Sequence, residues 1–436
     1  MQNKVQPRIL PGFMELLPED QITFNKMYDT IRGVYEQYGF LPLDTPTIEL
    51  SEVLLAKAGG ETEKQIYRFD KGDNDLSLRF DLTVPLARYV AQHYPDLAFP
   101  FKRYQMSKVF RGERPQKGRF REFYQCDIDV IGSDSLDLVY DAEMPAIIYR
   151  LFKKLDFGSF TIRMNNRKVL NGFFTELGYA DKIGDILRTI DKLEKIGRDA
   201  VVSELTEYGV KAEDTERILA FLAISGTNDE ILAGLNAAGV QNEKYLEGVQ
   251  ELGTVVDYLR KFGVEESAFR IDLTIARGLD YYTGTVYETM LNDYPSMGSV
   301  CSGGRYDNLT GYYTDQKLPG IGISIGLTRL FYQLRENGLV KKAGSIARCI
   351  VIPMGEDDMG AAVSVAAGLR GQDIPTDVYY QQKGMKQKMK YAARLGIPYA
   401  AIIGESERLA GTVMLKNMET GEQEAVAVAD LAAKIR

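Results

Sequence analysis

The sequence predicts a multidomain α+β and α/β protein with an antiparallel-sheet domain, a helical insertion and a C-terminal α/β domain. Strand-like segments are concentrated in residues 1–166 and 263–338, which we assign to one discontinuous sheet domain. Between them, residues 167–262 carry helical patterns and almost no strand signals, so they are interpreted as an insertion. Strands and helices alternate over residues 346–436, which predicts a small α/β domain with a mostly parallel sheet.

The first elements are a helix, an extended segment and a hairpin. Residues 19–38 place apolar side chains at helical spacing, and Gly39 follows as a stop signal. Residues 40–49 are expected to be extended, because Pro42 and Pro46 disfavour helix in the residues before them. The segments IYRFD and LSLRFDLT flank the turn sequence KGDND, which indicates a β-hairpin.

Longer strands follow on either side of a basic loop. FKRYQMSKVF and REFYQCDIDVIG predict an antiparallel pair, and the next segments predict a helix (SLDLVYDAEMPAIIYRLFKKL) and a strand (SFTIRMN). The insertion contains helical patterns such as KIGDILRTIDKLEKIG and TERILAFLAI. Strands return with FRIDLTI, GTVYETML and GIGISIG, and the last leads into the helix LTRLFYQLREN. The C-terminal domain alternates CIVIPM, a helix, TDVYY, the helix MKQKMKYAARLG, YAAIIG and TVMLKNM.

Composition excludes several classes of protein. No apolar run approaches the length of a membrane span, and the start MQNKVQPRILPGF has no apolar signal-peptide core, so we expect neither a membrane partner nor export. Three cysteines without CxxC spacing argue against a disulfide framework or a zinc site and favour a cytoplasmic location. The single histidine, His93, falls in a plain amphipathic helix pattern. Mechanisms built on catalytic or metal-ligating histidines are therefore disfavoured, and we expect no protein-held metal.

Positive charge is concentrated at one point of a chain whose net charge is −8. The loop between the two long strands contains five cations: Arg111, Arg114, Lys117, Arg119 and Arg121. In the strand that follows, the period of two places Gln125, Asp127 and Asp129 on one face, opposite an apolar face. The polar face is either solvated or the floor of a pocket. In a pocket, its carboxylates would accept hydrogen bonds from an N–H-bearing ligand while the arginines hold an anion.

Three further motifs are weaker when each is taken alone. In ARGLDYYTGTVYE (276–288), the adjacent Tyr281 and Tyr282 would face opposite ways on a strand, so only one could share a pocket with Arg277. CSGGRYDNL (301–309) contains a Gly-Gly pair that permits close backbone approach or positive φ, as in a turn. In GIGISIGLTRL (320–330), a glycine-spaced strand leads into a helix whose first turn carries Arg329, a combination suited to phosphate. It is neither a Walker loop nor a Rossmann fingerprint.

Together these segments resemble the histidyl-tRNA synthetase family of class II aminoacyl-tRNA synthetases. YGFLPLDTPTIE is similar to class II motif 1, FRGERPQKGRFREFYQCDIDV to motif 2 and GIGISIGLTRL to motif 3. RGLDYYTGTVYE and CSGGRYDNL resemble the two segments peculiar to the histidyl enzymes, and LRFDLTVPLAR matches their substrate strand. The resemblance extends from Phe13 to the C-terminus. One departure is Thr328, where many members have glutamate.

The resemblance implies that ATP activates histidine to histidyl-adenylate, which then esterifies the 3′ end of histidine tRNA. It implies a class II antiparallel-sheet catalytic domain and a C-terminal anticodon-binding α/β domain. Catalytic roles fall to Arg111, Arg277 and Gln125, and magnesium is expected on the ATP phosphates. The ATP-binding residues implied are Arg111, Glu113, Arg277 and Arg329. The histidine-binding residues implied are Asp81, Thr83, Arg111, Gln125, Asp129, Arg277, Tyr281, Tyr282 and Tyr306.

The same resemblance implies partners. The motif 2 loop would meet the tRNA acceptor stem through Gln116, Lys117, Arg119 and Arg121. A basic helix within residues 381–395, which contain no acidic residue, carries Lys383, Lys386, Lys388, Lys390 and Arg394, among which Lys386 and Lys390 are the candidates for tRNA contact. A homodimer is implied by motif 1. Two alternatives are a catalytically silent relative that regulates the first enzyme of histidine biosynthesis, and a tRNA-binding factor without chemistry.

Overall fold

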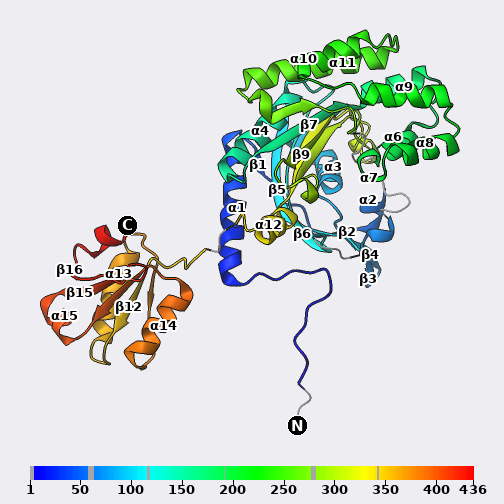
Figure 1. Cartoon of the computed structure of the whole chain (residues 1–436). Coiled ribbons are helices and arrows are strands. Elements are labelled where there is room, and N and C mark those ends of the chain that lie inside the picture. The colour runs from blue at the N-terminus through cyan, green and yellow to red at the C-terminus, as the bar shows by residue number, and fades with distance from the viewer. Residues whose placement is uncertain (1–3, 57–62, 115–117, 191, 276–280, 341–342) are drawn as a thin grey trace. The chain divides into compact units, whose positions relative to one another are not determined.

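The computed structural model describes residues 4–56, 63–114, 118–190, 192–275, 281–340 and 343–436. The chain separates into two compact units. The larger comprises Met1–Glu15 and Met27–Val340, and the smaller comprises Leu16–Lys26 and Lys341–Arg436. Figure 1 shows the elements of both units along the chain.

The larger unit is built on an eight-stranded sheet with the order β1-β5-β6-β11-β10-β9-β7-β8. Its strands are β1 (Leu41–Pro42), β5 (Phe101–Phe110), β6 (Glu122–Ile131), β7 (Phe160–Asn166), β8 (Phe269–Ile271), β9 (Thr285–Leu291), β10 (Cys301–Tyr306) and β11 (Gly320–Gly326). The edge pairs β1–β5 and β7–β8 are parallel, and the pairs between them are antiparallel. The predicted antiparallel pair around the basic loop is confirmed in β5 and β6.

A second, three-stranded sheet confirms the predicted hairpin. It consists of β2 (Ile48–Leu50), β3 (Arg68–Lys71) and β4 (Asn74–Leu78) in the order β2-β4-β3, and the short helix α2 (Ser51–Leu55) follows β2. The predicted strand LSLRFDLT is too long. Oδ1 of Asp81 accepts hydrogen bonds from the backbone N–H groups of Thr83 and Val84, so helix α3 (Thr83–Gln92) starts there instead.

One face of the large sheet packs against helix α4 (Val139–Leu155), which contacts β7, β10 and β11. Tyr287 on β9 donates its hydroxyl to the carbonyl oxygen of Asp141, and Arg305 on β10 forms a buried ion pair with the Asp141 carboxylate. Because side chains alternate along a strand, the neighbours Glu288, Ser302 and Tyr306 point to the opposite face. That opposite face carries the pocket described below.

The predicted helix, α1 (Pro18–Gln37), ends near Gly39, which has the predicted stop conformation with φ of +76°. In its second half, Tyr35 is fully buried and donates its hydroxyl to the carbonyl oxygen of Cys126 on β6.

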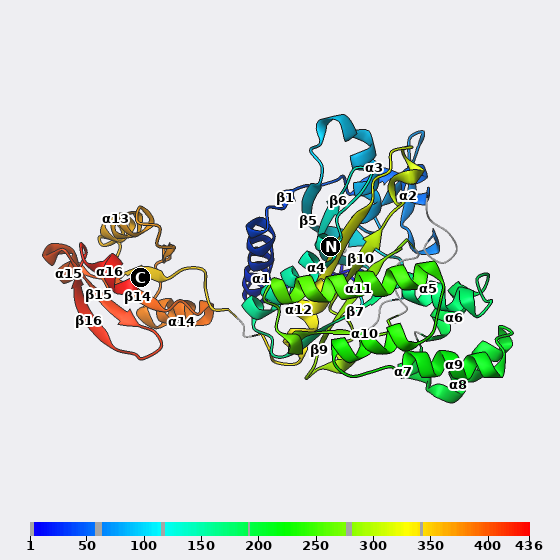
Figure 2. The ribbon, with the colours of Figure 1, turned by 90° about the horizontal axis from the view of Figure 1, so that it is seen from above.

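Helices dominate the segment between β7 and β8, as the sequence predicts. They are α5 (Arg167–Glu176), α6 (Ile183–Ile190), α7 (Leu193–Ile196), α8 (Arg198–Glu207), α9 (Ala212–Leu222), α10 (Asn228–Ala237) and α11 (Glu243–Lys261). Figures 1 and 2 show α8 to α11 gathered beyond one end of the large sheet. The rings of Phe173 on α5 and Phe221 on α9 stack with centroids 4.2 Å apart, which joins these helices into one core.

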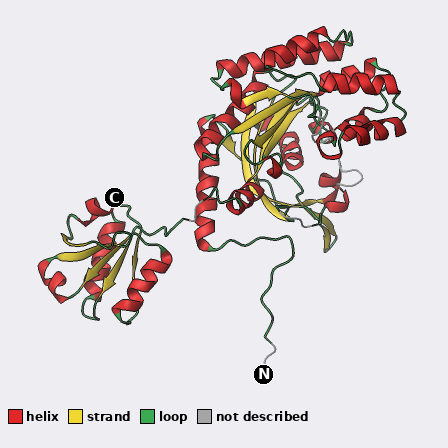
Figure 3. Cartoon of the chain, in the orientation of Figure 1, coloured by secondary structure: helices red, strands yellow, loops and turns green. Residues whose placement is uncertain are grey.

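The smaller unit has a five-stranded sheet with the order β13-β12-β14-β15-β16. Its elements are β12 (Cys349–Pro353), α13 (Met359–Arg370), β13 (Thr376–Val378), α14 (Met385–Leu395), β14 (Tyr399–Ile403), α15 (Glu405–Ala410), β15 (Thr412–Asn417), β16 (Gln423–Ala427) and α16 (Leu431–Ile435). The expectation of a mostly parallel sheet is wrong. Only β12, β13 and β14 are parallel, because β14, β15 and β16 follow one another as antiparallel neighbours. Figure 3 shows helices beside this sheet.

No helix in the described part of the chain is long and apolar enough to cross a membrane.

Candidate active site

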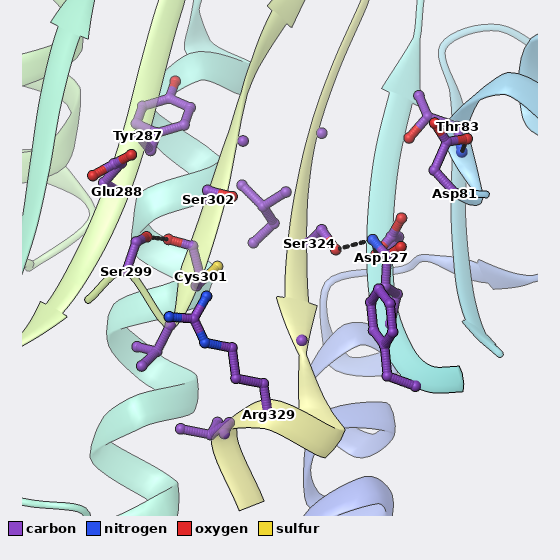
Figure 4. Close-up of a pocket in the computed structure, with 18 of the residues that line it drawn as sticks. Asp81, Thr83, Asp127, Tyr287, Glu288, Ser299, Cys301, Ser302, Ser324 and Arg329 are labelled. Carbon is purple, nitrogen blue, oxygen red and sulfur yellow. Dashed lines mark hydrogen bonds between the residues drawn. The ribbon is translucent and has the colours of Figure 1, made fainter. Parts of the chain in front are cut away.

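A pocket of about 520 Å³ opens on the face of the large sheet that lies opposite α4. Strands β6, β11 and β10 form its floor, and helix α12 (Leu327–Glu336) starts at one end. Figure 4 shows Asp81 and Thr83 on one side of β6, and Glu288 and Ser302 on the far side of β11. A pocket of this size accommodates a small-molecule ligand.

The polar face of β6 is the floor of this pocket. Gln125, Asp127 and Asp129 all line it and are only 7%, 2% and 3% exposed. These exposures exclude the solvated alternative for this face. Buried polar groups need partners, so the neighbouring strands must supply them.

Asp129 lies between a cation and a hydroxyl. Nη2 of Arg103, on the adjacent strand β5, lies 2.7 Å from Oδ2 of Asp129, and the Tyr306 hydroxyl donates to Oδ1 at 2.8 Å. Burial raises the pKa of Asp129, while Arg103 and Tyr306 oppose that rise. Gly322 on β11 leaves room for the Asp129 carboxylate, since a Cβ at position 322 would lie 2.1 Å from Oδ1 of Asp129.

Asp127 is the more strongly perturbed carboxyl. Burial raises its pKa to about 7, with Asp129 adding to the rise, while Arg103 and a hydrogen bond from Ser324 lower it. Next to it, Nε2 of Gln125 donates to Oγ of Ser324 at 2.7 Å.

The side wall of the pocket contains Asp81, Thr83 and a cluster of tyrosines. The expectation that only one of Tyr281 and Tyr282 can face the site is wrong. Strand β9 begins at Thr285, so these two residues precede it, and both rings line the pocket with centroids 4.9 Å apart. The Tyr306 ring meets that of Tyr281 at 5.8 Å. All three predicted tyrosines therefore gather at one site.

Two arginines mark the other half of the pocket. The Arg111 guanidinium carbon lies 4.5 Å from the ring centroid of Phe80 and 5.1 Å from that of Phe123, and its Nε donates to the carbonyl oxygen of Phe80. Stacking covers the faces of the guanidinium and leaves its edge suited to an oxyanion. Arg329, in the first turn of α12, donates to the carbonyl oxygen of Met297 at 2.9 Å. Burial lowers the pKa of both arginines, which indicates two cations with little hydration.

The motif 2 loop is only partly described. Glu113 and Arg119 both line the pocket and lie 3.6 Å apart as an ion pair. Arg121 instead donates to the carbonyl oxygens of Glu113 and Pro11, so its position supports the loop. Gln116 and Lys117 lie outside the described residues, and so does Arg277 of the RGLDYY segment.

The paired glycines Gly303 and Gly304 lie within strand β10, and neither has positive φ, so the turn interpretation is wrong. The two glycines are instead required because neighbouring backbone atoms approach them closely. A Cβ on Gly303 would meet the carbonyl oxygen of Gly322 at 2.1 Å, and one on Gly304 would meet that of Thr285 at 2.7 Å.

Thr328, the departure from the family pattern, has a structural role here. Its hydroxyl accepts a hydrogen bond from the backbone N–H of Tyr124 at 2.8 Å and so ties α12 to β6.

The basic helix of the smaller unit, α14, has two environments. Lys386 and Lys390 are exposed, as are Lys383 and Arg394. Lys388 is 1% exposed and donates to the carbonyl oxygen of Pro353, so it belongs to the core rather than to a basic surface.

The single histidine, His93, caps the end of α3 and does not line the pocket.

Sequence reasoning missed two residues that organise the pocket floor, Arg103 and Ser324. Arg103 is fully buried, but it is one of three cations in a strand-like segment, so the sequence does not single it out. Ser324 lies in the glycine-spaced segment, where it pairs with Asp127 across β6 and β11.

Among the described residues, no group of three or more His, Cys, Asp or Glu side chains could hold a metal ion.

An eight-stranded, mainly antiparallel sheet with a polar pocket that contains Arg111 and Arg329, a separate α/β unit and the matches to known proteins together place the chain among the class II aminoacyl-tRNA synthetases. Residues 12–330 match the family of histidyl-tRNA synthetases, and residues 348–436 match the anticodon-binding domain family. The chain belongs to the histidyl-tRNA synthetase family. The resemblance and the fold class predicted from the sequence are thereby confirmed.

The relatives match over nearly their whole length. The histidine–tRNA ligase of Clostridium tetani is 60% identical, with 97% of each chain covered, and that of Finegoldia magna is 47% identical, with 99% of this chain and 100% of the relative covered. The crystal structure of histidyl-tRNA synthetase from Nostoc sp. PCC 7120 is 43% identical, covers 99% of each chain and superimposes with a TM-score of 0.93. A Bacillus halodurans structure described as an ATP phosphoribosyltransferase regulatory subunit/histidyl-tRNA synthetase has a TM-score of 0.76 over 92% of this chain and 99% of its own, but its 20% identity shows the fold alone.

Proposed function

We propose that this chain activates histidine with ATP and transfers the histidyl group to the 3′ end of histidine tRNA. The observation that carries the proposal is the buried polar row of Gln125, Asp127 and Asp129, with Arg111 and Arg329 on the anion side of the same pocket. One half of the pocket thus suits an amino acid with N–H groups, and the other half suits phosphates.

In the proposed amino-acid half, Asp81, Thr83 and Gln125 bind the α-ammonium group. Asp129 and Tyr282 reach the imidazole, and Tyr281 and Tyr306 complete the wall. The argument for Asp129 is its ion pair with Arg103, which favours the ionised carboxylate that an imidazole N–H needs. Phenylalanine would leave these buried polar groups unpaired, and sites of this kind discriminate by about 10⁴–10⁵-fold.

In the proposed ATP half, Arg111 bridges the histidine carboxylate and the α-phosphate, and Arg277 approaches the same phosphate. The carboxylate oxygen attacks the α-phosphorus, pyrophosphate leaves, and the two cations neutralise the charge that develops on the α-phosphate oxygens. Arg329 holds the γ-phosphate, and Glu113 holds the adenine edge. Magnesium bound to ATP would neutralise phosphate charge, and the Glu288 carboxylate on that side of the pocket would offer the oxygen donor that magnesium prefers.

The proposed tRNA surfaces are the motif 2 loop and helix α14. Arg119 has a half-exposed side chain at the pocket mouth, where an acceptor end must enter. Gln116, Lys117 and Arg121 remain predictions, and Arg121 would act by holding the loop. Lys386 and Lys390 are exposed cations on a net acidic protein, as phosphate contacts require.

We also propose a homodimer and a cytoplasmic location. The motif 1 region exposes the large apolar residues Leu41, Ile48 and Leu50, which would be covered by a second copy. The three cysteines are free and buried, as is usual in a reducing compartment. The boundaries 1–166, 167–262, 263–338 and 346–436 are proposed as the domain limits.

Charging of a histidine tRNA transcript with labelled histidine and ATP tests the proposal. The expected product is histidyl-tRNA, formed with release of pyrophosphate. A folded, dimeric protein that binds histidine but forms no adenylate would instead support the regulatory alternative. Binding of tRNA without binding of histidine would support the third alternative, a tRNA-binding factor without chemistry.

A further inference from the structure

Three polar side chains on the pocket floor form one connected row. Gln125 and Asp127 lie on the same face of β6, and Ser324 lies beside Asp127 on β11 as its cross-strand partner. Nε2 of Gln125 donates to Oγ of Ser324 at 2.7 Å and to Oδ1 of Asp127 at 3.5 Å, and a hydrogen bond from Ser324 lowers the pKa of Asp127. All three line the pocket.

The direction of these hydrogen bonds follows from what each group can donate. Above its pKa of about 7, the Asp127 carboxylate is ionised and only accepts, so the Ser324 hydroxyl gives its single proton to Asp127. The same hydroxyl oxygen is then left as an acceptor, and only the amide nitrogen of Gln125 can donate to it. A reversed Gln125 amide would place two acceptors, Oε1 and Oγ, against each other.

The consequence is seen on the other end of the amide. Oε1 of Gln125 is buried and has no hydrogen-bond partner among the described residues. A buried acceptor without a partner costs free energy unless a ligand supplies the donor. The α-ammonium group of an amino acid is such a donor, and it is positively charged, so it requires the oxygen rather than the nitrogen of the amide.

We propose that Ser324 and Asp127 are positioning residues that hold the Gln125 amide with its oxygen toward the α-ammonium group of the bound histidine. The inference rests on the proposed function and extends it. Asp127 and Ser324 act through Gln125, and neither needs to touch the substrate. Removing the Ser324 hydroxyl should therefore weaken the binding of ligands that carry the ammonium group. The binding of ligands that lack this group should not change.

The test compares two ligands on the full chain by titration calorimetry, with inhibition of histidine-dependent pyrophosphate exchange as the second readout. Histidine carries the ammonium group, and 3-(imidazol-4-yl)propionate keeps the imidazole and carboxylate but lacks it. For Ser324→Ala, the dissociation constant of histidine should rise roughly 3- to 10-fold, the size of one neutral hydrogen bond, while that of imidazolylpropionate stays unchanged. Ser324→Thr, which keeps the hydroxyl, should restore the affinity for histidine.

Ser302→Ala is the matched control. Ser302 is the exposed cross-strand partner of Ser324 on β10, and the same oxygen is removed there. The ratio of the two dissociation constants should stay at the wild-type value. If Ser324→Ala does not fold, Ser324→Cys replaces it, because a thiol fills the same space but is a weak donor and acceptor.

If Ser324→Ala weakens the binding of both ligands equally, or weakens the binding of neither, the inference is overturned and the proposed function stays intact. A change of the ratio in Ser302→Ala also overturns it. If the wild-type protein fails to bind histidine at all, the proposed function itself fails.

Discussion

Nη2 of Arg103 lies 2.7 Å from Oδ2 of Asp129, and both side chains are almost completely buried beneath the pocket. The two residues face each other across strands β5 and β6. A charge taken out of water is stable only when it is paired, so this cation determines whether Asp129 can stay ionised.

Replacing the cation should destabilise the fold. Arg103→Met leaves the Asp129 carboxylate unpaired, and breaking a buried pair in this way costs about 3–5 kcal/mol of unfolding free energy. In Arg103→Met/Asp129→Asn the remaining charge is gone, so the loss should be smaller than the sum of the two single losses. Urea denaturation of wild type, Arg103→Met, Asp129→Asn and the double variant measures this coupling. If the two single losses of unfolding free energy simply add up in the double variant, the pair does not interact.

Removing the proposed imidazole acceptor should affect catalysis. Asp129→Asn should lower kcat/KM for histidine in pyrophosphate exchange by roughly 10- to 150-fold, the range of a hydrogen bond to a charged group. Tyr306→Phe removes only a neutral donor to Asp129 and should cost about 2- to 10-fold. The KM for ATP should change in neither variant. A larger effect of Tyr306→Phe than of Asp129→Asn would assign the main contact to Tyr306.

Stability should depend on pH through Asp127. Its pKa in the folded protein is about 7, above the value near 4 of an unfolded aspartate, so the folded state binds more protons between these limits. Its contribution to stability is therefore present at low pH and is lost as pH rises from about 4 to 7. Asp127→Asn cannot lose the proton. Its unfolding free energy relative to wild type should rise by about 2 kcal/mol from pH 5 to 7, at 1.36 kcal/mol per pH unit, because the wild-type carboxyl is only half ionised at pH 7. A difference that does not vary with pH would contradict the raised pKa.

A methyl group at Gly322 should displace the Asp129 carboxylate, since the added carbon would lie 2.1 Å from Oδ1. Gly322→Ala is expected to raise the KM for histidine by roughly 10-fold or more, because a charged contact is lost. Gly326→Ala, on the same strand, would meet its nearest atom, Cβ of Arg329, only at 3.9 Å. It should leave the KM for histidine unchanged, and equal effects in both variants would point to general disturbance of β11.

The exposed cations of α14 should matter for tRNA and not for the adenylate. Lys386→Ala and Lys390→Ala should each weaken tRNA binding and reduce the slope of log affinity against log salt by about 1. Histidine-dependent pyrophosphate exchange needs no tRNA and should stay at the wild-type rate. An unchanged salt slope would show that this face of α14 makes no phosphate contact.

Several features of the site are local and could be predicted from the sequence. The alternation in QCDID placed Gln125, Asp127 and Asp129 on one face, and motif resemblance brought Arg111, Arg329 and the tyrosines to one site.

Other features depend on strand register and on tertiary packing. Arg103 is separated from Asp129 by the whole basic loop, so only the pairing of β5 with β6 reveals the contact. Lys388 resembles its basic neighbours in sequence, and only the packing of α14 against β12 shows that it is buried. The length of β4 was overestimated because the Asp81 cap competes with strand continuation.

The proposed histidine site can be tested in one experiment, amino-acid-dependent ATP–pyrophosphate exchange across all twenty amino acids, with wild type and Asp129→Asn measured in parallel. Histidine alone should drive exchange by the wild-type protein, and Asp129→Asn should lose most of that activity while remaining folded. Exchange driven by a different amino acid, or exchange with histidine that does not depend on Asp129, would contradict the assignment of the β6 face as the histidine site.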